Sequence, residues 1–362
     1  MNTPIASSTD RILDLARWAP SGDNTQPWRF ETVDGQHVVL HGHDTHEHCV
    51  YDLDGWATQL SMGALVETAV IAATAHGWST QARRRTDLPQ DRPTFDLHFA
   101  PDNQIQPDPL LNWITKRAVQ RRRYATTPLS DEHKKALSDT VGSGHEVLWI
   151  ESARERQQMA VLLFRSARLR LVTHEAYRVH SEVIEWGSQF SHSKVPDQSL
   201  GVPQAVLNMM QFAMHSWERV QFFNRYMGGT MLPRVLMDFL PAIACGAHFA
   251  LLARRPARDM DDVVASGRAM QRFWLTASKL GLSLQPEMTP LIFSRYANEG
   301  RRFSVLPGTQ EEARDVAGRL ARIMGNDAAA RGVFIGRIGH GPKVAARSLR
   351  LDLDALRGTS AP

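Results

Sequence analysis

Residues 19–28 read APSGDNTQPW, and they follow directly on an apolar pattern typical of an amphipathic helix. The stretch is a short polar loop held between Pro20 and Pro27, and it offers the side chains of Ser21 and Asn24 together with free backbone N–H groups. Such a loop can bind a planar polar ligand, although it can also be a turn that only ends the helix. Other parts of the sequence favour the first interpretation.

Helical and strand patterns alternate around this loop. We expect a first helix from the N-cap candidates Thr9 and Asp10 to Pro20, a strand over 36–40 and a long helix over 54–76. These elements indicate a mixed arrangement of helices and strands rather than an all-helical one.

A proline-rich stretch divides the chain into two halves. Five prolines fall between residues 87 and 110, which is typical of a linker, and we place the halves at 1–105 and 106–362. The two halves show weak internal sequence similarity, because a shift of 204 residues aligns small residues in two helical segments. The aligned pairs are Gly63 with Gly267, Ala73 with Ala277 and Gly77 with Gly281.

The second half begins with a basic segment. Residues 112–124 are expected to form a helix in which Arg117 and Arg121, four residues apart, share one face. Two guanidinium groups on one face can hold a phosphate dianion. The first ten residues, by contrast, contain no basic residue. The polar loop and the arginine pair therefore lie in different halves of the chain.

The loop and the arginine segment resemble motifs of the nitroreductase-like flavoproteins. Residues 19–28 resemble the family's APSxxNxQPW loop, which contacts the isoalloxazine ring and ribityl chain of FMN across a subunit boundary. Residues 117–124 (RAVQRRRY) resemble the RxSxR motif that grips the FMN phosphate, but Val119 stands where a Ser or Thr is usual. Residues 277–288 and 334–347 resemble two further flavin-binding segments. The FMN contacts implied by the resemblance are Pro20, Ser21, Gly22, Asn24, Gln26, Arg117, Arg121, Gln285, Pro286, Glu287, Arg337 and Arg347.

The distribution of these motifs also resembles a particular branch of the family. Ordinary members are homodimers with two sites at the interface, whereas each half of this chain carries one part of a single site. The chain is therefore similar to the fused pseudo-dimers of the Acg-like branch. The implied fold is α+β, with two related halves fused as an intramolecular pseudo-dimer around central antiparallel or mixed sheets flanked by helices. Arg337 and Arg347 can equally be surface charges.

An insertion interrupts the resemblance at about 187–240. It is rich in methionine and aromatic side chains, which suit a lid or an adaptable apolar pocket beside a flavin. An equally good interpretation is that these side chains form the ordinary hydrophobic core of an inserted helical segment.

Several classes of protein are disfavoured. Interleaved charges with a net charge of +4 favour small anionic ligands over nucleic acid. The longest apolar stretch, 239–253, is too short for a membrane span. Two distant cysteines indicate neither a disulfide framework nor a zinc site, and the N-terminus lacks a secretory signal. We therefore expect a cytoplasmic protein with no nucleic-acid or membrane partner.

One histidine cluster has the residue types of a metal site. His41, His43, His46 and His48 lie in the sequence HGHDTHEH, where a strand would place the first two on one face. No matching ligands are evident elsewhere, so a solvated loop is the favoured interpretation and no metal is predicted.

The resemblance implies an FMN-dependent oxidoreductase. Such a protein takes hydride from NAD(P)H and reduces a nitroaromatic, quinone-like or other small acceptor, and the flavin rather than a side chain does the chemistry. The alternative is a non-catalytic protein that binds or stores FMN beneath a lid. A third possibility is an interaction module without flavin. The chain is expected to be a monomeric pseudo-dimer or a homodimer.

Overall fold

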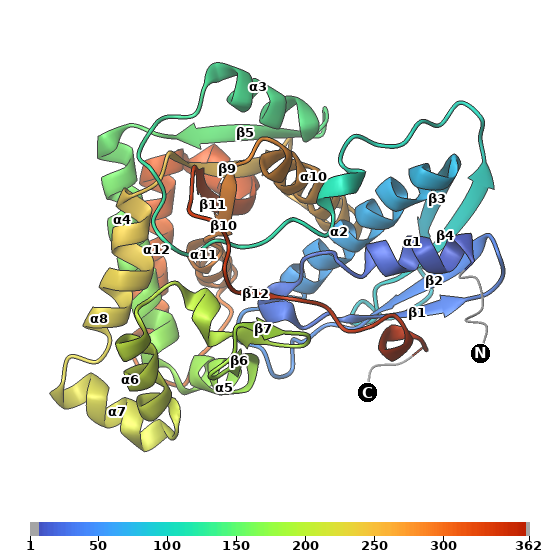
Figure 1. Cartoon of the computed structure of the whole chain (residues 1–362). Helices are drawn as coiled ribbons and strands as arrows, with labels where there is room; N and C mark the ends of the chain where they lie inside the picture. Colours follow the sequence, from blue (N-terminus) through green and yellow to red (C-terminus); the bar gives the residue numbers. More distant parts are fainter. Residues whose placement is uncertain (1–6, 360–362) are drawn as a thin grey trace.

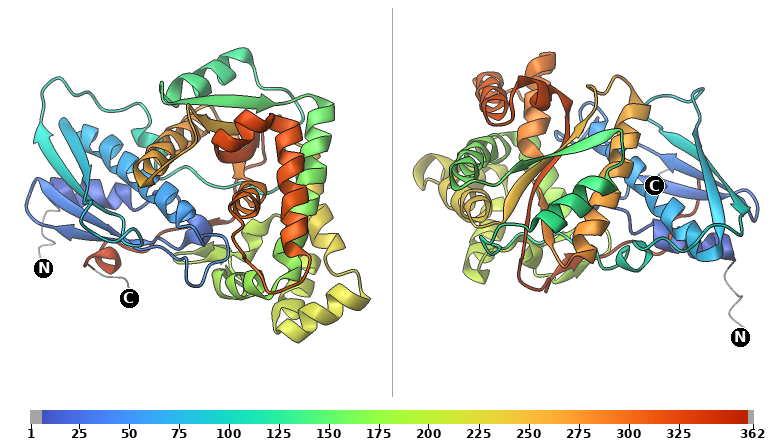
Figure 2. Two further views of the ribbon diagram at one scale, coloured as in Figure 1. Left: turned by 180° about the vertical axis from the view of Figure 1, so that it is seen from behind. Right: turned by 90° about the horizontal axis from the view of Figure 1, so that it is seen from above.

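Two four-stranded antiparallel sheets and a pair of long helices between them make up the centre of the protein (Figures 1 and 2). The computed structural model describes residues 7–359. The outermost residues of the two expected halves, 1–6 and 360–362, lie outside this range, as do the first six residues of the stretch judged to lack a secretory signal. The α+β class predicted from the sequence is confirmed. Among the described residues, no helix is both long enough and apolar enough to cross a bilayer.

The first sheet has the strand order β1-β2-β4-β3. Helix α1 (Ser8–Ala16) precedes it, and its N-cap is Ser7 rather than Thr9 or Asp10, because Ser7 and Asp10 form a reciprocal capping box. Side chains such as Ile12, Phe30 and Leu65 fill the core between this sheet and its helices. The elements are η1 (Gly22–Asn24), β1 (Trp28–Thr32), β2 (His37–Gly42), α2 (Trp56–Ala73), η2 (Thr74–His76), β3 (Trp78–Arg84) and β4 (Thr94–Pro101).

The second sheet has the order β10-β11-β9-β5. Its central strands β9 (Ala247–Ala253) and β11 (Gly332–Gly339) are buried along their whole length, because helices cover both faces. The remaining elements of this part are η3 (Leu111–Trp113), α3 (Asp131–Thr140), β5 (His145–Ile150), α4 (Ala153–Val172), α10 (Met260–Lys279), β10 (Ser283–Pro286), α11 (Thr289–Glu299), α12 (Thr309–Met324) and α13 (Asn326–Arg331).

The two sheets share one topology. When β1, β2, β3 and β4 are matched with β5, β9, β10 and β11, both sheets have the same order. Every neighbouring pair is antiparallel in both. A long helix, α2 or α10, joins the second matched strand to the third. Each of these helices leads into its strand through a left-handed glycine, Gly77 or Gly281.

Helices α2 and α10 cross backbone to backbone between the sheets (Figure 2). At the crossing point Gly63 faces Gly267, the residue with which the shift of 204 aligns it. A Cβ atom added to Gly63 would lie 2.1 Å from the carbonyl oxygen of Val264, and one added to Gly267 would lie 2.1 Å from that of Leu60. Only glycine therefore permits this approach.

The insertion forms a helical group at the far end of the second part (Figure 1). Many of its large apolar side chains are exposed, including Phe212, Phe222, Tyr226 and Met227. Its elements, with the preceding helix, are α5 (His174–Val183), β6 (Ile184–Glu185), β7 (Phe190–Ser191), β8 (Val195–Pro196), η4 (Asp197–Leu200), α6 (Gln204–Met214), α7 (Trp217–Tyr226), α8 (Met231–Pro233), the π-helical η5 (Arg234–Phe239) and α9 (Leu240–Ile243).

The last part of the chain returns to the first sheet (Figure 1). Strand β12 (Arg347–Ser348) pairs in parallel with β7, and η6 (Asp354–Leu356) places Leu356 in the core of the first sheet. Arg357 forms a bridge with Phe30 of β1. This tail therefore joins the C-terminal part of the sequence to the N-terminal core.

Two expectations about local structure are wrong. Residues 112–124 do not form a helix: after η3 the chain is extended, and Val119 pairs with Leu284 of β10. The backbone gains a sheet partner there, since the Gln120 N–H donates to the Leu284 carbonyl at 3.2 Å. The proline-rich stretch 87–110 is also not simply a linker, because it contains β4, an inner strand of the first sheet.

Candidate functional site

A cavity lies where four segments meet: the polar loop 19–28, the basic segment 112–124, the insertion 187–240 and the C-terminal tail that follows β11. Its empty space, including the part open to solvent, measures about 540 Å³. The residues that line it are Pro20, Ser21, Asp23, Asn24, Arg117, Ala118, Val119, Arg121, Val195, Ser199, Trp274, Arg347, Ser348 and Arg350. The loop of the first half and the arginine pair of the second half therefore face one cavity.

The loop backbone is held in an unusual conformation. Asp23, Asn24 and Gln26 all have positive φ angles, of 46°, 64° and 48°. Residues other than glycine rarely adopt this region, and such strain concentrates at ligand sites. The Ser21 hydroxyl stabilises the loop by accepting a hydrogen bond from the Gln26 backbone N–H at 3.0 Å.

Two amide side chains fasten the loop to the insertion and to the tail. Asn24 donates to the carbonyls of His192 and Lys194, both at 3.2 Å. Gln26 donates to the His192 carbonyl at 2.9 Å and accepts from the Leu351 N–H at 2.9 Å. In this structure these amides thus hold the wall of the cavity together. The prediction that they contact a flavin stays a prediction.

Arg117 and Arg121 reach the cavity from an extended segment. Side chains four residues apart share a face in an extended chain, so Arg117 and Arg121 can both line the cavity even though no helix forms, and Ala118 and Val119 between them line it too. Arg117 stacks over Trp274, with 4.5 Å from the guanidinium carbon to the ring centroid, and donates to the Trp18 carbonyl at 3.1 Å. These neighbours are neutral and leave the positive charge of Arg117 uncompensated.

The tail supplies two more guanidinium groups. Arg350 donates to the Ala19 carbonyl at 3.0 Å and to the side-chain oxygen of Asn24 at 2.7 Å. Arg347 donates to the carbonyls of Thr115 and Arg117, both at 3.0 Å. The acceptors of both side chains are again neutral, so the tail adds positive charge to the cavity without adding negative charge.

The four arginines form a positively charged cradle without a matching carboxylate. Within residues 7–359 none of them makes an ion pair, and the Nε atoms of Arg117 and Arg347 are buried without a hydrogen-bond partner. Burial lowers the pKa of Arg117 well below its ordinary value, and Arg350 and Arg347 lower it further. Because isolated buried charge is costly, a bound anion would stabilise this arrangement.

One acid does line the cavity. Burial raises the pKa of Asp23, while Arg121 and Arg170 act in the opposite direction. Asp23 is not within ion-pair distance of either arginine in the described part of the chain. A carboxyl group with a raised pKa offsets the positive cradle less than an ordinary carboxylate would.

The chain is similar to mycobacterial proteins across most of its length. A protein named "Putative NAD(P)H nitroreductase", from two strains of Mycobacterium tuberculosis, CDC 1551 and H37Rv, is 28% identical over 310 residues. The matched region covers 80% of this chain and 79% of that protein. An uncharacterized protein of strain CDC 1551 is 21% identical over 290 residues, which cover 80% of this chain and 40% of that protein. No family model matches the chain.

The similarity supports a nitroreductase-like relationship for this chain. The arrangement of antiparallel sheets flanked by helices is consistent with a nitroreductase-like fold. The similarity to the mycobacterial proteins adds to the resemblance of residues 19–28 and 117–124 to the family motifs, which rested on short motifs alone.

The structure brings together only some of the residues predicted as cofactor contacts. Pro20, Ser21, Asn24, Arg117, Arg121 and Arg347 line the cavity, whereas Gly22, Gln26, Gln285, Pro286, Glu287 and Arg337 do not. Sequence reasoning missed Asp23, Ser199, Trp274 and Arg350. Arg350 lies three residues after Arg347, so the basic run at the end of the sequence could have indicated it.

Arg337 supports the cradle from behind. It is fully buried, and it donates to the backbone carbonyls of Arg121 and Arg122 at 2.7 and 2.9 Å. It also donates to the side-chain oxygen of Gln285 and stacks over the ring of Tyr124. Arg337 and Gln285 thus position the backbone that carries Arg121, and the alternative that Arg337 is a surface charge is wrong.

His248 and Glu287 form a buried ion pair next to this group. The two ring nitrogens of His248 contact the Glu287 carboxylate at 2.7 Å and the Ala242 carbonyl at 2.9 Å. Both partners are acceptors, so the imidazolium satisfies both contacts. Burial alone would lower the pKa of His248, but Glu287 and Cys245 outweigh it and raise the pKa to about 10.

We expect Glu287→Gln to destabilise the protein in a pH-dependent way. The pKa of His248 is higher in the folded protein, about 10, than its ordinary value of 6.5, so the pair stabilises the fold fully below about pH 6.5. This contribution falls as the pH rises towards about 10. The variant should lose about 3 kcal/mol at neutral pH. Urea unfolding at several pH values measures this, with the exposed Glu182→Gln as control. A destabilisation that does not change across this window would contradict the charged pair.

The insertion contributes little apolar surface to the cavity. Only Val195 and Ser199 of residues 187–240 line it, and Ser199 contacts Arg121 through its hydroxyl at 3.3 Å. The methionine and aromatic side chains of α6 and α7 do not line it. The interpretation of the insertion as a methionine-rich pocket wall is therefore not supported by this arrangement.

The four histidines of residues 41–48 do not gather. His41 contacts Glu31 at 2.7 Å, and His46 contacts Asp44. Among the described residues, no metal-like group of three includes any of these four histidines.

Proposed function

We propose that the protein is an FMN-dependent oxidoreductase that takes hydride from NAD(P)H and passes electrons to a small acceptor. The observation that carries this proposal is the cradle of Arg117, Arg121, Arg347 and Arg350 beside the strained loop 19–28. A cradle of this kind suits the dianionic phosphate of a mononucleotide. The mycobacterial relatives named as NAD(P)H nitroreductases support the same reaction class.

The residues present fit such a group in their donor chemistry. The Nε atoms of Arg117 and Arg347, two residues that line the cavity, are buried donors without a hydrogen-bond partner in the described part of the chain. Val119, which replaces a hydroxyl residue of the family motif, offers no hydrogen bond, whereas the tail arginine Arg350 lines the same cavity. When bound, FMN would supply hydride acceptance and electron transfer. The chain would bind its phosphate, hold the loop 19–28 against it and limit access of water.

We further propose that the chain is a fused pseudo-dimer with one flavin site. The shared strand order of the two sheets supports this proposal, as does the crossing of α2 and α10 at aligned glycines. The cavity draws its loop from one half and its arginines from the other. We therefore expect one FMN per chain, and a monomer of the chain should suffice to bind it.

The visible spectrum of the purified protein tests the proposed function. We expect flavin absorbance at one FMN per chain, and bleaching when NADH or NADPH is added without oxygen. Colourless protein that fails to quench the fluorescence of added FMN would overturn the proposal. Bound FMN that neither reduced nicotinamide can bleach would instead indicate a storage protein. Quenching by iodide then separates an open site from one that the insertion covers.

A further inference from the structure

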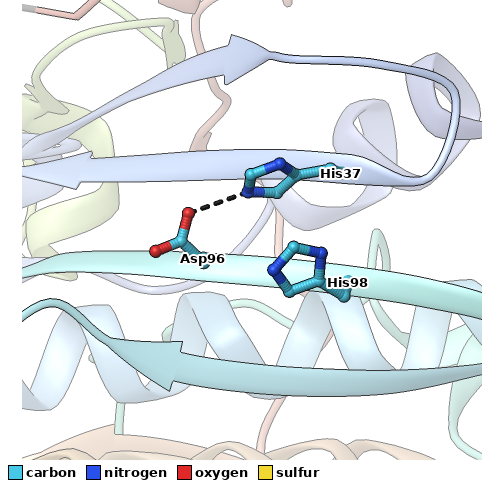
Figure 3. Close-up of side chains that lie close together, drawn as sticks. All are labelled: His37, Asp96 and His98. Carbon is cyan, nitrogen blue, oxygen red and sulfur yellow. Dashed lines mark hydrogen bonds and ion pairs between the residues drawn. The ribbon is translucent and has the colours of Figure 1, made fainter.

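Three metal-ligating side chains lie together on the outer face of the first sheet, away from the cavity. His37, Asp96 and His98 each offer a ligand atom, and these atoms all lie within 4.8 Å of one another (Figure 3). His37 contacts Asp96 at 2.8 Å, and the two imidazole rings stack with their centroids 4.1 Å apart. None of the three lines the cavity described above.

The sheet itself places these side chains side by side. His37 on β2 lies directly opposite His98 on β4 in the antiparallel register, and Asp96 lies two residues before His98 on the same face. The opposite face of these strands carries Val38 and Leu97, which belong to the core. The cluster is therefore built on rigid backbone and faces solvent, where an ion can enter.

We propose that His37, Asp96 and His98 bind a divalent transition ion of the zinc class. Two imidazole nitrogens and one carboxylate oxygen are a ligand set that Zn²⁺ and related ions accept, with the remaining positions filled by water. Hard ions such as Mg²⁺ prefer oxygen ligands and should bind weakly. The site joins two neighbouring strands, so a bound ion would tie β2 to β4.

Arg85 competes with such an ion for the carboxylate. Its guanidinium holds both oxygens of Asp96 at 2.8 Å, and this contact keeps the pKa of Asp96 below its ordinary value, with His37 adding to the effect. A bound ion would share Asp96 with Arg85 and would be repelled by its charge. Removing the arginine charge should therefore strengthen binding, whereas removing an ordinary surface arginine should not.

Titration of the full-length protein with ZnCl₂, after removal of any histidine tag, tests the proposal. Calorimetry should show one strong site per chain for Zn²⁺ and none of similar strength for Mg²⁺. His37→Asn and His98→Asn should each weaken Zn²⁺ binding at least about tenfold. His41→Asn and His76→Asn serve as controls and should leave it unchanged. Equal binding by the wild type and the His37 and His98 variants would overturn the proposal, as would a lack of binding by the wild type.

Two further measurements separate ligation from a general histidine effect. Arg85→Gln should tighten binding about fivefold, and an unchanged or weaker affinity in this variant would contradict the competition between Arg85 and the ion for Asp96. The thermal unfolding midpoint of the wild type should rise with ZnCl₂, because an ion that binds only the folded sheet stabilises it. The midpoint of His98→Asn should rise less at the same ZnCl₂ concentration, and an equal rise in both proteins would contradict the site.

Discussion

Replacing Arg117 with methionine is expected to weaken FMN binding about a hundredfold and, at the same time, to stabilise the flavin-free protein. Arg117 is 4% exposed and has no carboxylate partner among residues 7–359, so its charge is a cost until an anion arrives. Losing a buried charge-assisted contact to phosphate costs about 2–5 kcal/mol of binding. Methionine keeps the apolar contact with Trp274 without the charge. Fluorescence titration with FMN and thermal unfolding without FMN measure the two effects.

Two controls make this result specific to the phosphate. Riboflavin lacks the phosphate, so its affinity should be similar in the wild type and in Arg117→Met. Arg123→Met removes an exposed charge from the same segment and should change neither FMN affinity nor stability appreciably. Equal losses of FMN and riboflavin affinity would show that Arg117 supports the fold rather than the phosphate. Unchanged FMN affinity would remove Arg117 from the site.

The second large effect is expected at the crossing of α2 and α10. Gly63→Ala and Gly267→Ala each place a methyl group about 2.1 Å from a carbonyl oxygen of the other helix. The backbone cannot move aside as a flexible side chain can, so the helices must separate. We expect each variant to lose at least about 3 kcal/mol of stability. Urea unfolding measures the loss, and both variants should also lose FMN binding, since Trp274 of α10 lines the cavity.

A third glycine provides a matched control for the helix crossing. Gly318 lies in α12, and a Cβ atom there would meet nothing within 4 Å. Gly318→Ala should therefore stabilise the protein by about 0.5–1 kcal/mol, because alanine favours the helix. If Gly63→Ala were as stable as Gly318→Ala, the two long helices would not cross in this way in solution.

The prediction that Arg117 and Arg121 share a face did not depend on the secondary structure from which it was made. Arg117 and Arg121 were placed on one face by helical spacing, yet the segment is extended and pairs with β10. A separation of four residues puts side chains on the same face in both conformations. The inference about the shared face therefore survives a wrong secondary structure.

Long-range pairing explains what the sequence could not reveal. Helical periodicity located α1 and α2, and the shift of 204 residues aligned Gly63 with Gly267, although it did not predict that α2 and α10 cross at these glycines. The return of the tail to the first sheet has no local signal, since Leu356 and Arg357 find their partners through tertiary packing alone. The pairing of His37 with His98 likewise depends on strand register, which the sequence alone does not give. The histidines of residues 41–48 are closer together in the sequence, yet they form no such group within the described part of the chain.

Asn24 and Gln26 show how a motif can have more than one task. Their amides hold the insertion and the tail against the loop, so the polar residues that suggested a ligand site are also structural. No local sequence pattern separates these two uses of an amide side chain.

The late position of the tail arginines has a consequence for biosynthesis. Arg347 contacts the backbone of Arg117, 230 residues earlier in the chain. Every strand of both sheets and both long helices precede residue 340, whereas Arg347 and Arg350 are translated after all of them. If the chain binds FMN as proposed, a chain stopped after β11 would lack two of the four arginines of the cradle, so stable loading with flavin would have to wait until the tail has been translated.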